Sequence, residues 1–104
     1  GGDSASAVET IHEIIKNEDD SNQRLFASAY NSLGTIYESA GELKKAREAY
    51  LHTELIFAND RELHAEALFR MAQLWPQLGE PDRANRARST LLERYPNSYW
   101  TSQL

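Results

Sequence analysis

Histidine and carboxylate side chains are the residues of this 104-residue chain whose spacing could support chemistry. His12-Glu13 begins a zinc-protease pattern, but Lys16 stands where that pattern needs its second histidine ligand. Glu18-Asp19-Asp20 could hold a hard cation, but it lacks the glycine and the spaced ligands of a calcium loop. We therefore expect a solvated acidic turn there, and neither a metal nor a cofactor.

The sequence also shows no recognisable motif for nucleophilic catalysis or phosphate binding. The chain has no cysteine, which excludes disulfides, thiolate metal sites and a cysteine nucleophile. Its three histidines, His12, His52 and His64, fall on three separate predicted segments. No glycine-rich phosphate loop is present, and no serine stands in a nucleophile elbow. The sequence thus predicts a protein that is not an enzyme.

The net charge of −5 is unevenly distributed along the chain. Residues 1–60 hold eleven acidic against five basic side chains, whereas residues 61–104 hold five against six. An acidic first half argues against a nucleic-acid partner, because binding phosphates needs clustered lysine and arginine. Four arginines share one predicted helix, for which we expect a solvated face with local ion pairs: Arg83, Arg86, Arg88 and Arg94. No apolar run approaches the ~20 residues of a membrane span, so direct membrane insertion is not expected.

Two stretches of the chain share the same order of residues. The first reads Tyr30-x-x-Leu33-Gly34-x-x-Tyr37, then Gly41-Glu42, then Ala46-x-x-x-Tyr50. The second reads Leu68-x-x-Met71-Ala72-x-x-Trp75, then Gly79-Glu80, then Ala84-x-x-x-Arg88. Tyr37 and Trp75, Gly41 and Gly79, and Ala46 and Ala84 are each 38 residues apart. A fixed offset between two such patterns is typical of a repeat protein.

Helical periodicity runs through the whole chain. Apolar residues recur at intervals of three and four, which predicts helices over roughly 5–17, 23–39, 43–58 and 62–77, and a fifth that begins at Pro81 and ends at Tyr95-Pro96. Asn97 or Ser98 should then cap a short sixth segment. Gly41 and Gly79 should end helices, and Pro76 should kink the fourth helix or end it early. No window alternates as a strand does. We therefore predict an all-α fold of six helical segments, with short loops that make neighbouring helices antiparallel.

At these residues the chain resembles the tetratricopeptide repeat, an aromatic-x-x-Leu-Gly-x-x-Tyr block followed by Ala-x-x-x-Phe on two antiparallel helices. The resemblance implies helix pairs stacked as a short right-handed superhelix in a single domain, 1–104. Residues 1–22 would be the second helix of a partial repeat. Full repeats would follow at 23–60 and 61–97, and 98–104 would cap the stack or begin another repeat. The period exceeds the usual ~34 residues, and the extra residues, near Arg61–His64, should lengthen a helix by about one turn.

The resemblance also implies a scaffold that binds a peptide or a partner protein. First helices of successive repeats line a groove that accepts an extended peptide or a partner helix. Carried over position by position, the expected groove residues are Ser28, Asn31, Thr35, Glu38, Glu66, Phe69, Gln73 and Gln77. A clamp for a terminal carboxylate is not expected, because no lysine lies on either groove helix and Arg70 stands alone.

Two alternatives to the groove stay open. The chain could be a structural segment that stacks on further repeats or on a second copy, with Tyr99 and Trp100 as the docking residues of a homodimer or a longer stack. It could also be a regulatory domain attached to an enzyme. The ending Leu92-Glu93-Arg94-Tyr95-Pro96-Asn97-Ser98 resembles bacterial repeats of this family, including envelope-associated ones. The compartment is thus open between the cytoplasm and a bacterial envelope, and the missing initial methionine suggests a segment excised from a longer chain.

Overall fold

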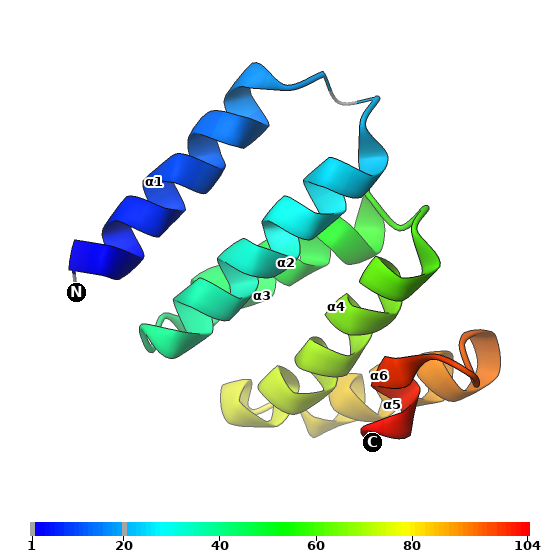
Figure 1. Cartoon of the computed structure of the whole chain (residues 1–104). Coiled ribbons are helices and arrows are strands. Elements are labelled where there is room, and N and C mark those ends of the chain that lie inside the picture. The colour runs from blue at the N-terminus through cyan, green and yellow to red at the C-terminus, as the bar shows by residue number, and fades with distance from the viewer. Residues whose placement is uncertain (1, 20) are drawn as a thin grey trace.

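The computed structural model describes residues 2–19 and 21–104, and the regular elements in that part of the chain are all helical (Figure 1). They are α1 (Gly2–Asn17), α2 (Gln23–Ser39), α3 (Leu43–Leu55), α4 (Arg61–Leu74), the 3-10 helix η1 (Trp75–Leu78), α5 (Pro81–Arg94) and α6 (Tyr99–Ser102). Each of the six α-helices packs against a neighbour in the sequence. The all-α prediction is confirmed.

Three of these helices begin in the same way, one period apart. The side-chain oxygens of Asn22, Asp60 and Ser98 each accept a hydrogen bond from a backbone N–H two or three residues further on, at 3.3, 2.9 and 3.2 Å. Such a cap satisfies one of the N–H groups that a helix leaves without a partner at its start. Because these caps are spaced by 38 residues, they support a repeat that begins at α2, α4 and α6. Arg61–His64 form the first turn of α4.

Two helix ends repeat as well. Gly41 and Gly79 have φ angles of 79° and 78°, a left-handed conformation that costs glycine little. The next residue in each case returns a hydrogen bond across the glycine: the Glu42 N–H donates to the Tyr37 carbonyl, and the Glu80 N–H to the Trp75 carbonyl, both at 2.9 Å. This pattern closes the helix and turns the chain toward its antiparallel partner. The predicted role of both glycines is confirmed.

Some helix bounds differ from those predicted. The regular helix α4 ends at Leu74 and continues as η1, because Pro76 lacks the N–H that an α-helical turn would use. The third helix, expected to reach residue 58, ends at Leu55. The chain turns there, and the Phe57 ring stacks on Phe26 with ring centroids 5.1 Å apart. Helix α1 begins at Gly2, three residues before the predicted start.

The core lies mainly between α3, α4 and α5. Its largest fully buried side chains include Tyr50, Leu74 and Leu91. Alanines separate these large residues along the helices and let the backbones approach one another. A close approach lies between α2 and α3, where a Cβ atom added to Gly34 would stand 2.2 Å from a Tyr50 ring carbon. The glycine inside α2 is therefore explained by the buried ring of the partner helix.

Candidate functional site

A hollow of about 400 Å³ lies between α2 and α4, the two helices whose caps Asn22 and Asp60 are 38 residues apart. Its lining residues are Ser28, Asn31, Ser32, Thr35 and Ile36 from α2, and Glu66 and Arg70 from α4. Residues spaced by four lie on one helix face, so Ser28, Ser32 and Ile36 form one row along α2. The hollow thus brings together four of the eight predicted groove residues: Ser28, Asn31, Thr35 and Glu66. Gln77 is exposed on η1 outside the hollow.

Asn31 joins the two walls of the hollow. Its side chain is only 2 % exposed, and Nδ2 donates to the Leu63 carbonyl at 3.0 Å and to Glu66 Oε1 at 3.2 Å. Among the described residues, nothing hydrogen-bonds its buried Oδ1. Because both amide hydrogens point into the contact between α2 and α4, Asn31 fixes the spacing of the walls and presents little surface to a ligand.

Glu66 and Arg70 form a half-buried ion pair on the α4 wall. Arg70 Nε donates to Glu66 Oε2 at 2.9 Å, and the two side chains are 28 % and 17 % exposed. The guanidinium also lies over the Trp100 ring, 5.2 Å from its centroid. The positive charge of Arg70 is thus already paired with the carboxylate one turn earlier on α4. The pair leaves this wall close to neutral.

Thr35 and Glu38 are tied to a buried tyrosine of α3. The Tyr50 hydroxyl donates to Glu38 Oε1 at 2.5 Å and lies 3.4 Å from Thr35 Oγ1. Burial raises the pKa of Tyr50 far above its ordinary value, and the hydrogen bond to Glu38 adds to this rise. Thr35 also donates to the Asn31 carbonyl at 3.1 Å. Glu38 therefore orients a core side chain and does not line the hollow, whereas Thr35 does both.

The remaining predicted residues lie elsewhere. Phe69 is 9 % exposed and packs on Trp100, with ring centroids 5.6 Å apart. Gln73 is exposed on α4 outside the hollow. Of the two end residues, Trp100 is half-buried against α4, whereas Tyr99 is 61 % exposed. The short helix α6 thus covers part of the α4 surface that the sequence assigned to a ligand.

Sequence reasoning missed Ser32, Ile36 and Arg70 as lining residues. Ser32 and Ile36 continue the row that begins at Ser28, so the interval of four along α2 was the available signal. They were passed over because the expected groove positions came from the family resemblance. Ser28 and Ser32 are exposed, and no described residue hydrogen-bonds their hydroxyls. These two groups are free to bond a ligand.

The hollow offers hydroxyl groups for hydrogen bonds and an apolar side chain. Its hydroxyls can donate to a peptide carbonyl or accept from a peptide N–H, and Ile36 adds apolar contact. Across residues 2–19 and 21–104, no three histidine, aspartate or glutamate side chains are grouped so as to hold a metal ion. Within the same residues, no helix combines the length and apolar character needed to cross a membrane.

The comparison with protein families finds a match in the second half of the chain. Residues 66–98 match the family model of the tetratricopeptide repeat. This segment covers most of α4, all of η1 and α5, and the turn up to the cap of α6. No curated protein and no solved structure matches the chain. The recognition made from the repeated residues is confirmed by this match.

Proposed function

Because this chain carries a tetratricopeptide repeat, we propose that it is a non-catalytic scaffold that binds a peptide or a partner protein. Repeats of this family are interaction modules, and they are generally not catalytic. Stacked helix pairs present extended surfaces to which a partner can bind. The finer part of the proposal is the place of binding, the hollow between α2 and α4.

The observation that carries this placement is a hollow whose two walls are joined by hydrogen bonds and whose rim carries exposed hydroxyl groups. Asn31 bridges α2 to α4, and Glu66 holds Arg70, so the walls have a fixed spacing before any partner arrives. A preorganised site loses less entropy on binding. The exposed hydroxyls of Ser28 and Ser32 stand one turn apart on the rim, where they can bond the backbone of an extended segment.

Filling the hollow should weaken peptide binding strongly without unfolding the protein. Peptides are first selected from a random library on the immobilised wild-type domain. We expect Ser32→Trp, a change at an exposed position, to lower the affinity of these peptides by about tenfold or more. Ser39→Trp is the matched control, because Ser39 is an exposed serine on the same helix but outside the hollow. Dissociation constants measured by fluorescence anisotropy give the comparison. Selected peptides that bind both variants as tightly as the wild type would rule out the hollow as the binding place.

Stacking on further repeats or on a second copy is the second candidate, and the exposed ring of Tyr99 favours it. If Tyr99 forms such a contact, the solution mass should exceed the 11.8 kDa of the monomer at high concentration. Tyr99→Ser should then return it to the monomer, because a large apolar contact is lost. Light scattering after size exclusion measures this mass. A wild-type chain that stays monomeric at every concentration would remove self-association from consideration.

A further inference from the structure

The side of the molecule formed by the second helices carries the same cleft twice. One cleft, of about 220 Å³, lies between α1 and α3 over α2, and the other, of about 120 Å³, lies between α3 and α5 over α4. Equivalent lining residues are 38 positions apart, among them Leu33 and Met71, Tyr37 and Trp75, and Lys45 and Arg83. Neither cleft shares a lining residue with the hollow between α2 and α4.

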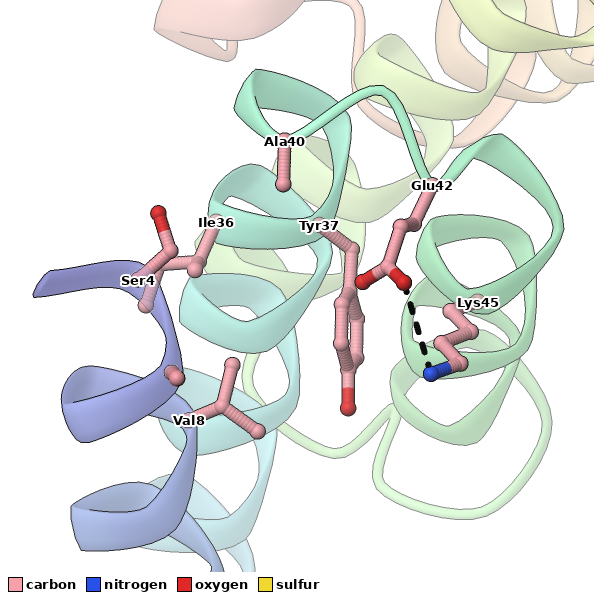
Figure 2. A pocket seen from close by; sticks show the side chains of 8 residues that line it. Ser4, Val8, Ile36, Tyr37, Ala40, Glu42 and Lys45 are labelled. Carbon is pink, nitrogen blue, oxygen red and sulfur yellow. Dashed lines mark ion pairs between the residues drawn. The ribbon is translucent and has the colours of Figure 1, made fainter. Parts of the chain in front are cut away.

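Each cleft contains the same group of an aromatic ring, a cation and an acid. In the first, Lys45 Nζ lies 3.5 Å from Glu42 Oε1 and 5.7 Å from the centre of the Tyr37 ring. Figure 2 shows this group where it also lines an adjoining hollow, with Tyr37 between α1 and α3. In the second, Arg83 Nε lies 3.2 Å from Glu80, and the guanidinium lies 5.1 Å from the Trp75 ring centre. Lys45 and Arg83 are therefore each already paired with a carboxylate and an aromatic ring of the chain.

The two clefts differ in the charge of one lining residue. Glu48 lines the first cleft, and Arg86 stands at the equivalent position of the second. Arg86 is exposed, and within the described part of the chain its guanidinium has no hydrogen bond or ion pair. Glu54, the acid that lines the second cleft, is half-buried, and this burial raises its pKa although nearby Arg94 lowers it. The second cleft therefore offers a free cation beside the buried Trp75 ring of η1 and the buried side chains of Leu68 and Met71 of α4.

An exposed apolar patch adjoins this cleft. Leu51 lines both the second cleft and a hollow of about 290 Å³ on the outer surface of α3. Leu55 and Ile56 line the same hollow and are 71 % and 60 % exposed. Adjacent large apolar side chains that are rimmed by polar residues mark interaction surfaces on soluble proteins. Apolar surface and a free arginine are thus continuous across α3 and α5.

We propose that the second cleft and the patch of Leu51, Leu55 and Ile56 together bind an acidic, apolar segment of a partner protein. Apolar side chains of the segment cover the patch, and one of its carboxylates pairs with Arg86. Charge complementarity selects this occupant, because α5 carries four arginines against two acids, Asp82 and Glu93. An arginine can bind a carboxylate through two parallel hydrogen bonds. This surface lies beyond the proposed hollow and would let the scaffold hold two segments at once.

Short synthetic peptides of matched composition test the proposal on the whole chain. One is rich in glutamate and leucine, one in lysine and leucine, and one in glutamate and serine. We expect only the first to bind measurably by fluorescence anisotropy. Arg86→Glu, which gives position 86 the acid found at the equivalent position of the first cleft, should weaken that binding by about tenfold or more, because the paired carboxylate loses its charge-assisted hydrogen bonds.

The controls separate this surface from general charge and from the other proposed site. Arg88→Glu makes the same charge change at an exposed arginine of α5 outside the cleft, and it should retain most of the binding. Equal losses in Arg86→Glu and Arg88→Glu would overturn the proposal, because the attraction would then be diffuse. Comparable binding of all three peptides, or of none, would overturn it as well. If Ser32→Trp lost the binding of the glutamate- and leucine-rich peptide while Arg86→Glu kept it, the peptide would bind in the hollow. That result would overturn this proposal and support only the proposed function.

Discussion

Replacing Gly34 by leucine is expected to destabilise the fold by about 3 kcal/mol or more, near the upper end of overpacking costs. A Cβ atom at this position would stand 2.2 Å from one Tyr50 ring atom and 2.5 Å from two others, whereas real Cβ contacts essentially never fall below 3.0 Å. The Tyr50 ring cannot move aside easily, because it is fully buried and its hydroxyl is held by Glu38. The helices α2 and α3 would have to separate.

Urea unfolding followed by far-UV circular dichroism measures this loss. Ser39→Leu is the matched control, since Ser39 is an exposed position of the same helix, and its effect should stay within about 0.5 kcal/mol. A double-mutant cycle identifies the clash directly. Gly34→Ala should cost less in a Tyr50→Leu background than in the wild type, because the atoms that it meets are then absent. Wild-type stability of Gly34→Leu would contradict the packing of α2 on α3.

Gly34 also illustrates what the sequence could predict. A glycine in the middle of a strongly periodic helix needs a packing reason, so a close helix contact there could be predicted, whereas its partner, Tyr50, is given by the structure. Helix caps, helix-ending glycines and the effect of Pro76 are local properties of a few neighbouring residues, so they too could be predicted. The period of 38 residues then orders the helices without any three-dimensional information.

The groove residues were harder to predict, because their availability depends on how neighbouring repeats pack. Asn31 faces the groove side of α2, but its amide is used to join α2 to α4. Phe69 faces the same side of α4, but α6 covers it through Trp100. A single sequence gives the face of a helix on which a residue lies, whereas the register between two helices decides whether a neighbour occupies it. The charge difference between Glu48 and Arg86 was visible in the sequence, but the cleft around each was not.

Acid is expected to weaken the fold through His64, the buried histidine of α4. Its ring is 2 % exposed, and Nδ1 lies 2.6 Å from the Tyr95 hydroxyl. Its Nε2 is buried without a partner among the described residues. Burial lowers the pKa of His64 to about 4, and the charge of Arg94 acts in the same direction. The neutral ring is the form that fits this site, because a second N–H would have no acceptor.

The sign of the pH dependence follows from proton binding. Between about pH 4 and 6.5, the range from the folded pKa to the ordinary value, the unfolded chain binds a proton at His64 and the folded chain does not. The free energy of unfolding therefore rises with pH across this window and levels off above it. The difference in pKa corresponds to about 3 kcal/mol lost when the pH falls below the window. Urea unfolding at a series of pH values measures the curve.

Carboxylates titrate in part of the same window, so the variants decide the assignment. His64→Gln should flatten the curve relative to the wild type, because its side chain does not titrate, whereas His12→Gln, at an exposed histidine, should leave the slope unchanged. Parallel curves for the wild type and His64→Gln would remove His64 as the cause.

Tyr95, which His64 bonds, also accepts a hydrogen bond at its carbonyl from Thr101 Oγ1 at 2.6 Å. Charging His64 should therefore loosen α6 first, and with it the ring that covers Phe69, so acid would expose more of α4 before the repeats unfold.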